Sequence, residues 1–180
     1  MRKLTVAEFI SLDGVVEAPD TWHFPYLNDE MMAAIGEGAA ASDTMLIGRV
    51  TYDSFAGAFA DLPDDDPTGA MMNRPRKVVV SRSVSTLAWR NSELLKGDVV
   101  AAVRALKKKR GGNIMTVGSI SLVRTLLRAG LVDELDLLVH PIVVGRGQRL
   151  FEDEGPQIPL ELVECTVLKT GVTRQVYRPA

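Results

Sequence analysis

The sequence predicts a single α/β domain over residues 1–180. Its central sheet is expected to be mixed and mostly parallel, with helices on both faces and antiparallel C-terminal strands. Three observations support this prediction. Strand-like segments alternate with segments of helical periodicity along most of the chain. The last two strand-like segments are separated only by a short turn. The length of 180 residues suits one hydrophobic core.

The first half of the chain is expected to contain three strands. Each is rich in apolar and β-branched residues, which fit a pleated and partly buried surface. The third has three consecutive valines, which indicates burial on both faces. Glu8 interrupts the otherwise apolar first strand. The three segments are residues 3–10, 44–47 and 77–81.

Two helices are expected among these strands. Asn28 is a suitable N-cap for a helix through about Ala41, with Asp29 and Glu30 in its first turn. The second helix follows the strand that ends at Gly48. The apolar faces of the two helices are expected to consist of Met31, Met32 and Ile35, and of Tyr52, Phe55 and Phe59.

The second half begins with prolines and like charges over residues 61–69, which predict a solvated surface loop. Asp98 is expected to cap a helix that ends before Gly111 and Gly112, and a further helix ends at Gly130. The strands expected in this half are residues 113–117, 134–144, 160–168 and 172–177.

Composition excludes several classes of function. A formal net charge of -2 argues against a nucleic-acid partner, and the basic run 107–110 is expected to be a solvated helix end. Two histidines and one cysteine cannot form a recognisable metal site, so Cys165 and His140 are interpreted as core residues. The N-terminus lacks a signal peptide, and no stretch could span a bilayer. The sequence therefore predicts a cytoplasmic protein that does not engage membranes.

Two strand-to-helix turns are rich in residues that suit phosphate groups. At the first, Gly48 permits a tight exit from the strand, Arg49 offers a guanidinium, and Thr51 supplies a hydroxyl at the helix start. At the second, the small residues Gly118 and Ser119 leave backbone N–H groups open to a pyrophosphate. Each turn alone is weak support, because glycine at such a position is more often plain turn chemistry.

A third element strengthens the interpretation. The valine strand ends in Ser81, Arg82 and Ser83, a set of hydroxyls and a guanidinium that suits a 2′-phosphate and would select NADP over NAD. Open α/β sheets bind ligands beyond the carboxyl ends of their strands, so the three turns are expected to form one site. The segment 145–150 begins like a dinucleotide fingerprint, but Pro156 follows too soon for a long helix.

The motifs together resemble the dihydrofolate reductase superfamily. MLIGRVTY at 45–52 resembles its segment of strand, Gly-Arg-x-Thr-aromatic and helix. VVVSRS at 78–83 resembles the strand and loop that meet the adenosine 2′-phosphate, and IMTVGS at 114–119 resembles the later strand and Gly-Gly turn. The rest is more similar to the reductase domain of bacterial riboflavin biosynthesis and its stand-alone relatives, in SLDG at 11–14, LVDEL at 131–135 and PIVVGRGQRLF at 141–151.

The resemblance implies a dihydrofolate reductase-like three-layer α/β/α fold, NADPH as hydride donor, and frequent homodimers. Residues 131–138 and the adjoining strand are one possible dimer surface. The cofactor residues implied by position are Gly48, Arg49 and Thr51 for phosphates, Ser81 and Arg82 for the 2′-phosphate, and Gly118, Ser119 and Ile120 for the pyrophosphate.

Two departures from the pattern bear on activity. Ser119 replaces the second glycine of the Gly-Gly turn. The carboxylate that binds the pterin in dihydrofolate reductase is matched by Leu27, while Asp29 and Glu30 are shifted and are more often surface acids that stabilise a helix start. Asp29 is the candidate catalytic group, and true folate reduction is disfavoured.

The candidate substrate residues are Asp13, Trp22 and Phe24. Asp13 is expected at the mouth of the substrate cleft, or in an Asx-turn with Gly14. Trp22 and Phe24, with Tyr26, could form an aromatic wall for a flat heterocycle or could pack the loop onto the core. His23 lies among them and could reach the substrate, although a loop histidine is usually only solvated.

The leading hypothesis is an NADPH-dependent reductase that transfers hydride to a small planar nitrogen heterocycle, pterin-like or similar to a pyrimidine riboflavin precursor. The alternative is a non-catalytic nucleotide-binding protein that retains the fold, which Leu27 and Ser119 favour. Riboflavin-pathway reduction proper is a third possibility, against which stands the absence of a zinc-binding deaminase signature.

Overall fold

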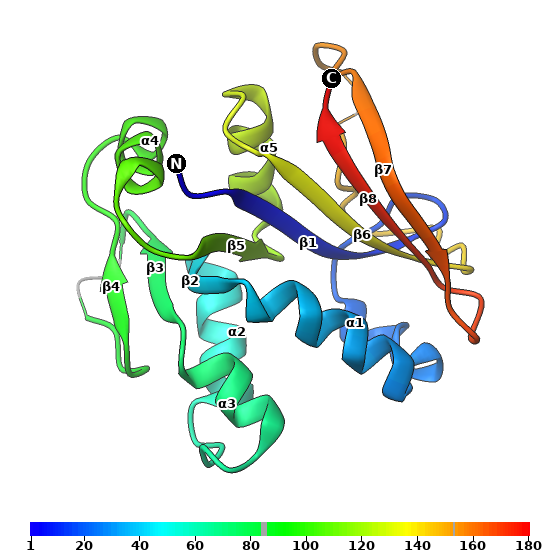
Figure 1. Cartoon of the computed structure of the whole chain (residues 1–180), viewed down its shortest axis with the longest axis horizontal. Helices are drawn as coiled ribbons and strands as arrows, with labels where there is room; N and C mark the ends of the chain where they lie inside the picture. The colour runs from blue at the N-terminus through cyan, green and yellow to red at the C-terminus, as the bar shows by residue number, and fades with distance from the viewer. Residues whose placement is uncertain (84–85, 153) are drawn as a thin grey trace.

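Eight strands form one sheet in a computed structural model that describes residues 1–83, 86–152 and 154–180 (Figure 1). Their spatial order is β4-β3-β2-β5-β1-β6-β8-β7. The pairings are parallel except for β6 with β8 and β7 with β8, which are antiparallel. The strands are β1 Leu4–Ser11, β2 Ser42–Gly48, β3 Arg76–Val80, β4 Ser92–Leu94, β5 Asn113–Val117, β6 Glu134–His140, β7 Leu160–Val167 and β8 Thr173–Pro179.

The helices cover the sheet on both faces, so the expected dihydrofolate reductase-like three-layer fold is confirmed. Helices α1, α2 and α3 lie on one face, and α4 and α5 lie on the other (Figure 1). The α-helices are α1 Asp29–Ala40, α2 Arg49–Phe59, α3 Pro67–Asn73, α4 Val99–Lys108 and α5 Ile120–Arg128, and the 3-10 turns are η1 Pro19–Thr21 and η2 Phe24–Tyr26.

Strand β1 shows how the alternation of residues supplies both cores. Leu4, Val6 and Ile10 point to the face of α4 and α5, where they pack in a cluster with Val103 and Val123. Burying an aliphatic side chain of this size stabilises the fold by about 1.5–3 kcal/mol. Because the side-chain period of a strand is two, the residue between Val6 and Ile10 on that face is not apolar: it is a glutamate.

Several expected helix starts are confirmed in detail. The side chain of Asn28 accepts a hydrogen bond from the N–H of Met31 at 2.9 Å, and Asp98 caps α4 in the same way through Ala101. The apolar face of α1 differs from the expected one: Met31 is fully buried, whereas Met32 is exposed, because it points away from the sheet.

The segment 61–69 is not a loop throughout. Pro67 begins helix α3, and the carboxylate of Asp66 accepts a hydrogen bond from the N–H of Gly69 at 2.8 Å. Proline is tolerated in the first turn because the N–H that it lacks would have no helical partner there. Only the part before Asp66 stays a surface loop, in which Asp61, Asp64 and Asp65 are exposed.

Two strands differ from expectation. Strand β6 ends at His140 and not at residue 144, because Pro141 has no N–H for the ladder and the N–H groups of Val144 and Gly145 bond to Asp13 instead. Strand β4 was not expected, since its three residues have no apolar pattern and it pairs only with β3.

Three expectations about burial need correction, the second only at Lys107, because Lys108, Lys109 and Arg110 are exposed as expected. Cys165 is exposed on the edge strand β7, so it is not a core residue. Lys107 is buried, and its ammonium donates to the carbonyl of Leu131 at 2.7 Å and to Asp133 at 2.5 Å. Most of the segment 131–138 is buried because β6 lies inside the sheet, so it offers no free surface for a dimer.

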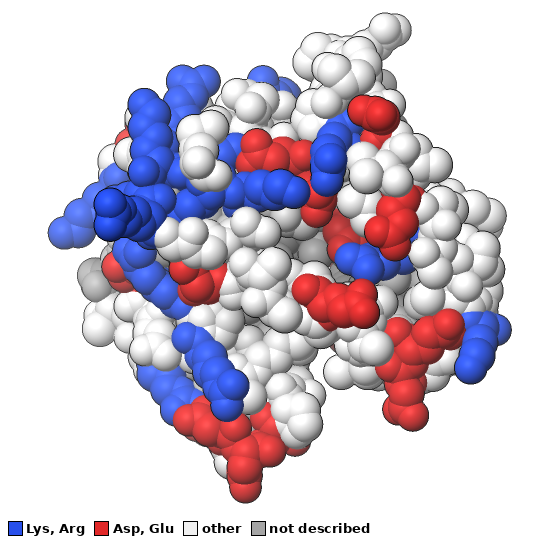
Figure 2. Space-filling view, in the orientation of Figure 1, with Lys and Arg blue, Asp and Glu red and all other residues white. Residues whose placement is uncertain are grey.

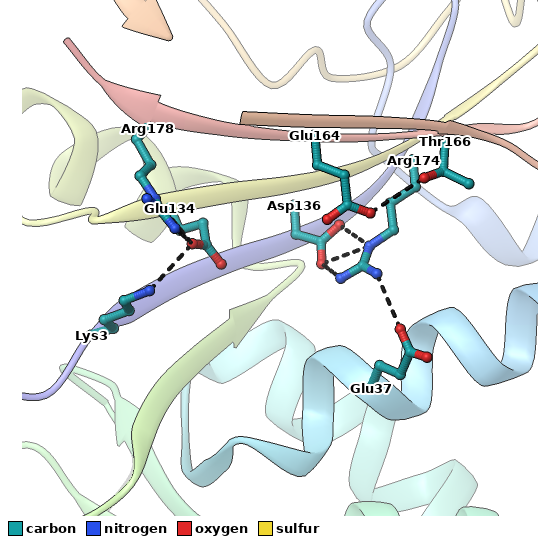
Figure 3. A network of polar contacts seen from close by, with 8 residues as sticks. All are labelled: Lys3, Glu37, Glu134, Asp136, Glu164, Thr166, Arg174 and Arg178. Carbon is teal, nitrogen blue, oxygen red and sulfur yellow. Dashed lines mark hydrogen bonds and ion pairs between the residues drawn. The ribbon is translucent and has the colours of Figure 1, made fainter. Parts of the chain in front are cut away.

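A polar network ties α1 to the antiparallel half of the sheet (Figure 3). Arg174 of β8 forms ion pairs with Asp136 of β6 at 2.7 Å and with Glu37 of α1 at 3.5 Å. The hydrogen bond to Asp136 is the largest cause that raises the pKa of Arg174. The network therefore fixes how α1 sits on β6 and β8, and its charges are used within the fold.

Charge is unevenly distributed over the face drawn in Figure 2. Lys and Arg gather on the side of β4 and α4, where Lys108, Lys109 and Arg110 are exposed. The acidic loop before α3 forms the lower tip. None of the helices in the part of the chain that the structure describes is both long enough and apolar enough to cross a bilayer.

Candidate nucleotide-binding site

The strand order of the sheet brings together the three turns that were predicted to bind phosphate groups. Strands β3, β2 and β5 are adjacent and parallel, so the turns that follow them leave the same edge of the sheet. Helix α2 begins directly after β2, and α5 begins after the turn that follows β5. Contacts between the three turns show that they adjoin, while their convergence into one cofactor pocket stays a prediction.

Hydroxyl groups join the first two turns. The N–H of Gly48 donates to the hydroxyl oxygen of Ser119 at 2.8 Å. The N–H of Ser119 donates to Oγ1 of Thr51 at 2.9 Å, and the Ser119 hydroxyl donates to the same oxygen at 3.0 Å. The starts of α2 and α5 are therefore linked as one unit, although 68 residues separate Thr51 from Ser119.

Two consecutive residues in the left-handed region shape the second turn. Gly118 has φ +59° and Ser119 has φ +57°. A Cβ on Gly118 would lie 3.1 Å from Oγ1 and 3.2 Å from Cγ2 of Thr51, a tight contact that adds to the backbone strain of any other residue at this φ. The replacement of glycine by Ser119 is accommodated, because its hydroxyl gains two partners that offset the strain of a left-handed serine.

Both helix starts are suited to an anion. No side chain caps the N-terminus of α2 or α5, and neither helix has an acidic residue in its first turn. Ile120 is the first residue of α5, so its N–H belongs to the group that lacks a helical partner. Backbone N–H groups and the helix dipole together favour negative charge at such ends. The N–H groups of Gly118 and Ser119 are not open as expected, because they bond to Glu8 and Thr51. The donors left for a pyrophosphate at this turn therefore begin at Ile120.

The third turn reaches the first through an arginine. Nη1 of Arg49 donates to the hydroxyl of Ser83 at 3.2 Å, while its Nε pairs with Asp53 at 3.0 Å. The N–H of Ser83 donates to the hydroxyl of Ser81 at 3.2 Å. Arg82 lies between these serines and is exposed. Asp53 offsets part of the charge of Arg49, so Arg49 attracts an anion less strongly than an unpaired guanidinium would.

A buried carboxyl, that of Glu8, lies beside the second turn and is not among the predicted site residues. Glu8 is 5% exposed, and its Oε1 has no hydrogen-bond partner among the described residues. Burial raises the pKa of Glu8 well above the usual carboxyl range, and a hydrogen bond from the Gly118 N–H lowers it by less. The sequence signal for Glu8 was a glutamate within an apolar strand, but only the register of β1 against β5 shows that Gly118 lies beside it.

The aromatic loop before α1 packs largely against the sheet. Trp22 is 6% exposed, and its Nε1 donates to the carbonyl of Glu17 at 3.2 Å. Phe24 is 60% exposed, with its ring centroid 4.3 Å from that of His23. Of the proposed aromatic wall, Phe24 is thus open to a ligand, whereas Trp22 contributes to the core.

Two histidines form the centre of this aromatic cluster. His23 stacks on Phe9 with centroids 4.7 Å apart, and His140 meets Trp22 edge-on at 5.1 Å. Burial lowers the pKa of both histidines, which therefore remain neutral near neutral pH. His140 is a core residue as expected, although only its Nδ1 has a hydrogen-bonding contact, with the carbonyl of Leu138 at 2.8 Å.

Asp13 organises the loop that follows β6. Its carboxylate accepts hydrogen bonds from the N–H groups of Val144 and Gly145 at 3.0 and 2.9 Å. The Ser11 hydroxyl also donates to it, at 2.7 Å, and these bonds lower the pKa of Asp13 to about 2. The N–H of Val15, which an Asx-turn at Asp13 would use, donates instead to the hydroxyl of Ser11 at 2.9 Å, so the suggested Asx-turn does not form.

Asp29 takes no part in the hydrogen bonds that join the three turns. It is exposed in the first turn of α1, where a carboxylate complements the helix dipole. The neighbouring Glu30 accepts a hydrogen bond from the N–H of Lys169 at 2.8 Å, which joins α1 to the turn between β7 and β8. A catalytic role for Asp29 stays a prediction.

An open hollow of about 550 Å³ lies at the other edge of the sheet, at the starts of β2, β3 and β4. Arginines line it, but Arg2 is paired with Asp43 and Arg76 with Glu93. It shares no residue with the three turns, so we place the candidate site at the turns, where backbone donors and hydroxyls gather.

Comparison with known proteins identifies relatives of the chain. Residues 2–174 match the family described as the RibD C-terminal domain. The uncharacterized proteins YyaP and YwjB of Bacillus subtilis strain 168 are 28% and 26% identical, over 98% and 89% of this chain and 94% and 89% of their own lengths.

Two solved structures share the fold. A putative riboflavin biosynthesis protein from Shewanella sp. PV-4 has a TM-score of 0.78 at 20% identity, with 99% of both chains covered. A pyrimidine reductase-like protein from Corynebacterium diphtheriae has a TM-score of 0.66 at 13% identity, with 99% of this chain and 92% of that chain covered.

Proposed function

We propose, from the premise that the chain belongs to the RibD C-terminal domain family, that it is an NADPH-dependent reductase. Its substrate is a small planar nitrogen heterocycle, either pterin-like or similar to a pyrimidine precursor of riboflavin. The family match and the two structural neighbours support a reductase of the riboflavin-precursor type. The choice of NADPH as the cofactor and of a planar heterocycle as the substrate goes beyond that support and is our proposal.

One observation carries the proposal: three turns from adjacent parallel strands are joined by hydrogen bonds at one edge of the sheet. Nothing in the folding of a sheet requires that hydroxyls, glycines and guanidinium groups gather there. Open α/β sheets bind nucleotides at this kind of edge. The donor set also matches the chemistry of NADPH, whose pyrophosphate and 2′-phosphate are anions joined by the ribose of its adenosine.

Each part of the site has a fitting partner in NADPH. The start of α5 at Ile120, shaped by Gly118 and Ser119 before it, would hold the pyrophosphate. Gly48 shapes the same end through its bond to Ser119, and the Thr51 hydroxyl, which accepts from Ser119, would donate its own proton to a phosphate oxygen. Ser81, Arg82 and Arg49 would hold the 2′-phosphate through a guanidinium and hydroxyls.

NADPH supplies hydride when it is bound, and the chain's own residues position and shield the reacting rings. The aromatic loop suits this task. Phe24 presents a largely exposed ring, and Trp22 and His23 anchor it to the sheet. Holding two flat rings together in a site without water lowers the barrier with little side-chain chemistry. Asp13 would act indirectly, by fixing the 144–145 loop at the mouth of this region.

We further propose a homodimer that uses the edge strand β7. Leu162, Val163 and Val167 are exposed there, and an uncovered apolar edge strand favours association. Light scattering of the wild type and of Val167→Lys is the measurement. A wild-type monomer at micromolar concentration would refute the homodimer and leave the reductase proposal untouched.

Calorimetric titration with NADPH and NADH tests the cofactor. We expect the wild type to prefer NADPH, and Arg82→Ala to lose that preference by on the order of tenfold or more, because a guanidinium–phosphate contact is charge-assisted. Arg104→Ala is the matched control, since Arg104 is exposed on α4, away from the three turns. No binding at millimolar NADPH would refute the proposal.

Leu27 favours a second candidate, a nucleotide-binding protein without turnover, because it stands where a substrate-binding carboxylate would be expected. The two candidates differ in one readout. Steady oxidation of NADPH with a pterin, a flavin precursor or a quinone would exclude the non-catalytic protein. Tight NADPH binding without oxidation across such a panel would favour it.

A further inference from the structure

Two acidic side chains are buried in the part of the chain that the structure describes, and Glu8 differs from the other, Asp136, because Asp136 pairs with Arg174 whereas no ion pair explains Glu8. The buried Lys107 pairs with Asp133, and the buried Arg2 pairs with Asp43. Glu8 is equally enclosed, yet one of its two oxygens, Oε1, has no partner among the described residues. An ionised carboxylate without a partner is costly in such an environment, so the group is retained there in its neutral form.

The register places this carboxyl at the phosphate turn. Ala7 of β1 pairs with Val117 of β5, so Glu8 lies level with Gly118, whose N–H hydrogen-bonds to the carboxyl. Gly118 is in turn enclosed on its other side by Thr51. The left-handed glycine that opens the second turn is thus held between the Glu8 carboxyl and the start of α2.

The surroundings of Glu8 contain no compensating charge. At its level, β6 presents Leu137, and the first turn of α5 carries Ile120, Ser121 and Leu122, none of which titrates near neutral pH. The first charged residue of α5, Arg124, donates to the carbonyls of Arg149 and Leu150. No charge–charge interaction contributes to the shift in the pKa of Glu8. Any charge on Glu8 would therefore act on the turn directly.

We propose that Glu8 is a positioning residue that carries a proton in the folded chain and couples that proton to nucleotide binding at the turn of Gly118 and Ser119. The inference rests on the proposed function, because the nucleotide is NADPH. With a proton on one oxygen, the other oxygen accepts the Gly118 N–H and the carboxyl stays neutral beside the pyrophosphate. Loss of the proton to solvent places a like charge next to that anion and weakens binding.

NADPH titrations at pH values from about 7 to about 9.5 test the coupling. The affinity of the wild type should fall by on the order of tenfold across this range, since like charges shift a carboxyl pKa by about 1–3 units. Glu8→Gln keeps the shape and the hydrogen bond without the charge, so its affinity should not show this fall. Glu134→Gln, at the opposite end of neighbouring β6, is the matched control and should behave as the wild type.

The outcomes separate this inference from the function on which it rests. Equal pH dependence in the wild type and Glu8→Gln would overturn the role of Glu8 while the reductase proposal stands. Absence of NADPH binding at every pH would overturn the reductase proposal and the nucleotide half of the inference.

A measurement without nucleotide tests the other part of the inference, that Glu8 carries a proton in the folded chain. The free energy of unfolding of Glu8→Gln should rise relative to that of the wild type as pH increases. The unfolded wild type releases the Glu8 proton at a lower pH than the folded wild type does, so a higher pH favours unfolding of the wild type, and the variant has no such proton. Titration of the Glu8 carboxyl by carbon-13 NMR in the wild type provides the same answer if the variant does not fold. An ordinary carboxyl pKa for Glu8 in the folded chain would refute the claim that it keeps its proton there.

Discussion

The backbone N–H of Gly48 donates a 2.8 Å hydrogen bond to the hydroxyl of Ser119, across 71 residues of sequence. The same hydroxyl donates to Thr51 at 3.0 Å. A single side chain thereby fixes the end of β2 relative to the start of α5. The two helix starts that we assign to phosphate groups are consequently one rigid unit.

Thr51→Val should weaken this unit while preserving shape. The valine removes the oxygen that accepts both the N–H and the hydroxyl of Ser119. Leaving a partly buried donor unsatisfied costs about 1–3 kcal/mol of stability. We expect a loss in the free energy of unfolding of that size in urea titrations, together with NADPH binding weaker by on the order of tenfold. Thr125→Val is the control, because its hydroxyl bonds only to the carbonyl of Ser121 within α5. Equal effects of the two variants would contradict the role of Thr51.

Substitutions at Ser119 should separate hydroxyl bonding from backbone strain. Both Ser119→Ala and Ser119→Gly lose the bonds to Gly48 and Thr51, but only glycine adopts φ +57° freely. We expect Ser119→Gly to be more stable than Ser119→Ala by about 1 kcal/mol in chemical unfolding. Equal stability would show that the turn relaxes when the hydroxyl is lost.

Asp13→Asn should destabilise the protein in a pH-dependent way. The hydrogen bonds from Ser11, Val144 and Gly145 lower the pKa of Asp13 from 3.8 to about 2 in the folded chain. A depressed carboxyl pKa stabilises the fold above the unfolded-state pKa, and this contribution is lost as pH falls through the folded value. The stability gap between wild type and variant should therefore close between about pH 4 and about pH 2. Asp20→Asn, an exposed change in η1, should show no such gap.

The histidine cluster should make the protein sensitive to mild acid. Burial lowers the pKa of His140 in the folded chain, and burial together with the nearby His140 lowers that of His23. A lowered histidine pKa means that the unfolded chain binds the proton first, so stability falls as pH drops below about 6.5. His140→Phe keeps a ring between Trp22 and Tyr26 and should flatten this fall in urea titrations at successive pH values. A curve as steep as that of the wild type would contradict the assignment to His140.

Local sequence rules predicted the elements whose signals lie within a few residues. The caps at Asn28 and Asp98, the buried valine strand and the antiparallel final pair follow from side-chain type and spacing. The same rules missed β4, because a strand of three residues without a pattern exists only through its pairing with β3. They also extended β6 past Pro141, where the competing partner of the backbone N–H groups is Asp13, more than 100 residues away.

The alternating α/β architecture and the three turns predicted to suit phosphate follow from local patterns in the sequence, because backbone propensity and hydrophobic period are local properties. The folded chain was needed to show that Ser119 bonds to Gly48 and Thr51, that Cys165 lies exposed on an edge, and that Glu8 is enclosed beside Gly118. These relationships depend on strand order and register between segments far apart in the chain. Register is set by the packing of the whole sheet, and no short stretch of sequence contains it.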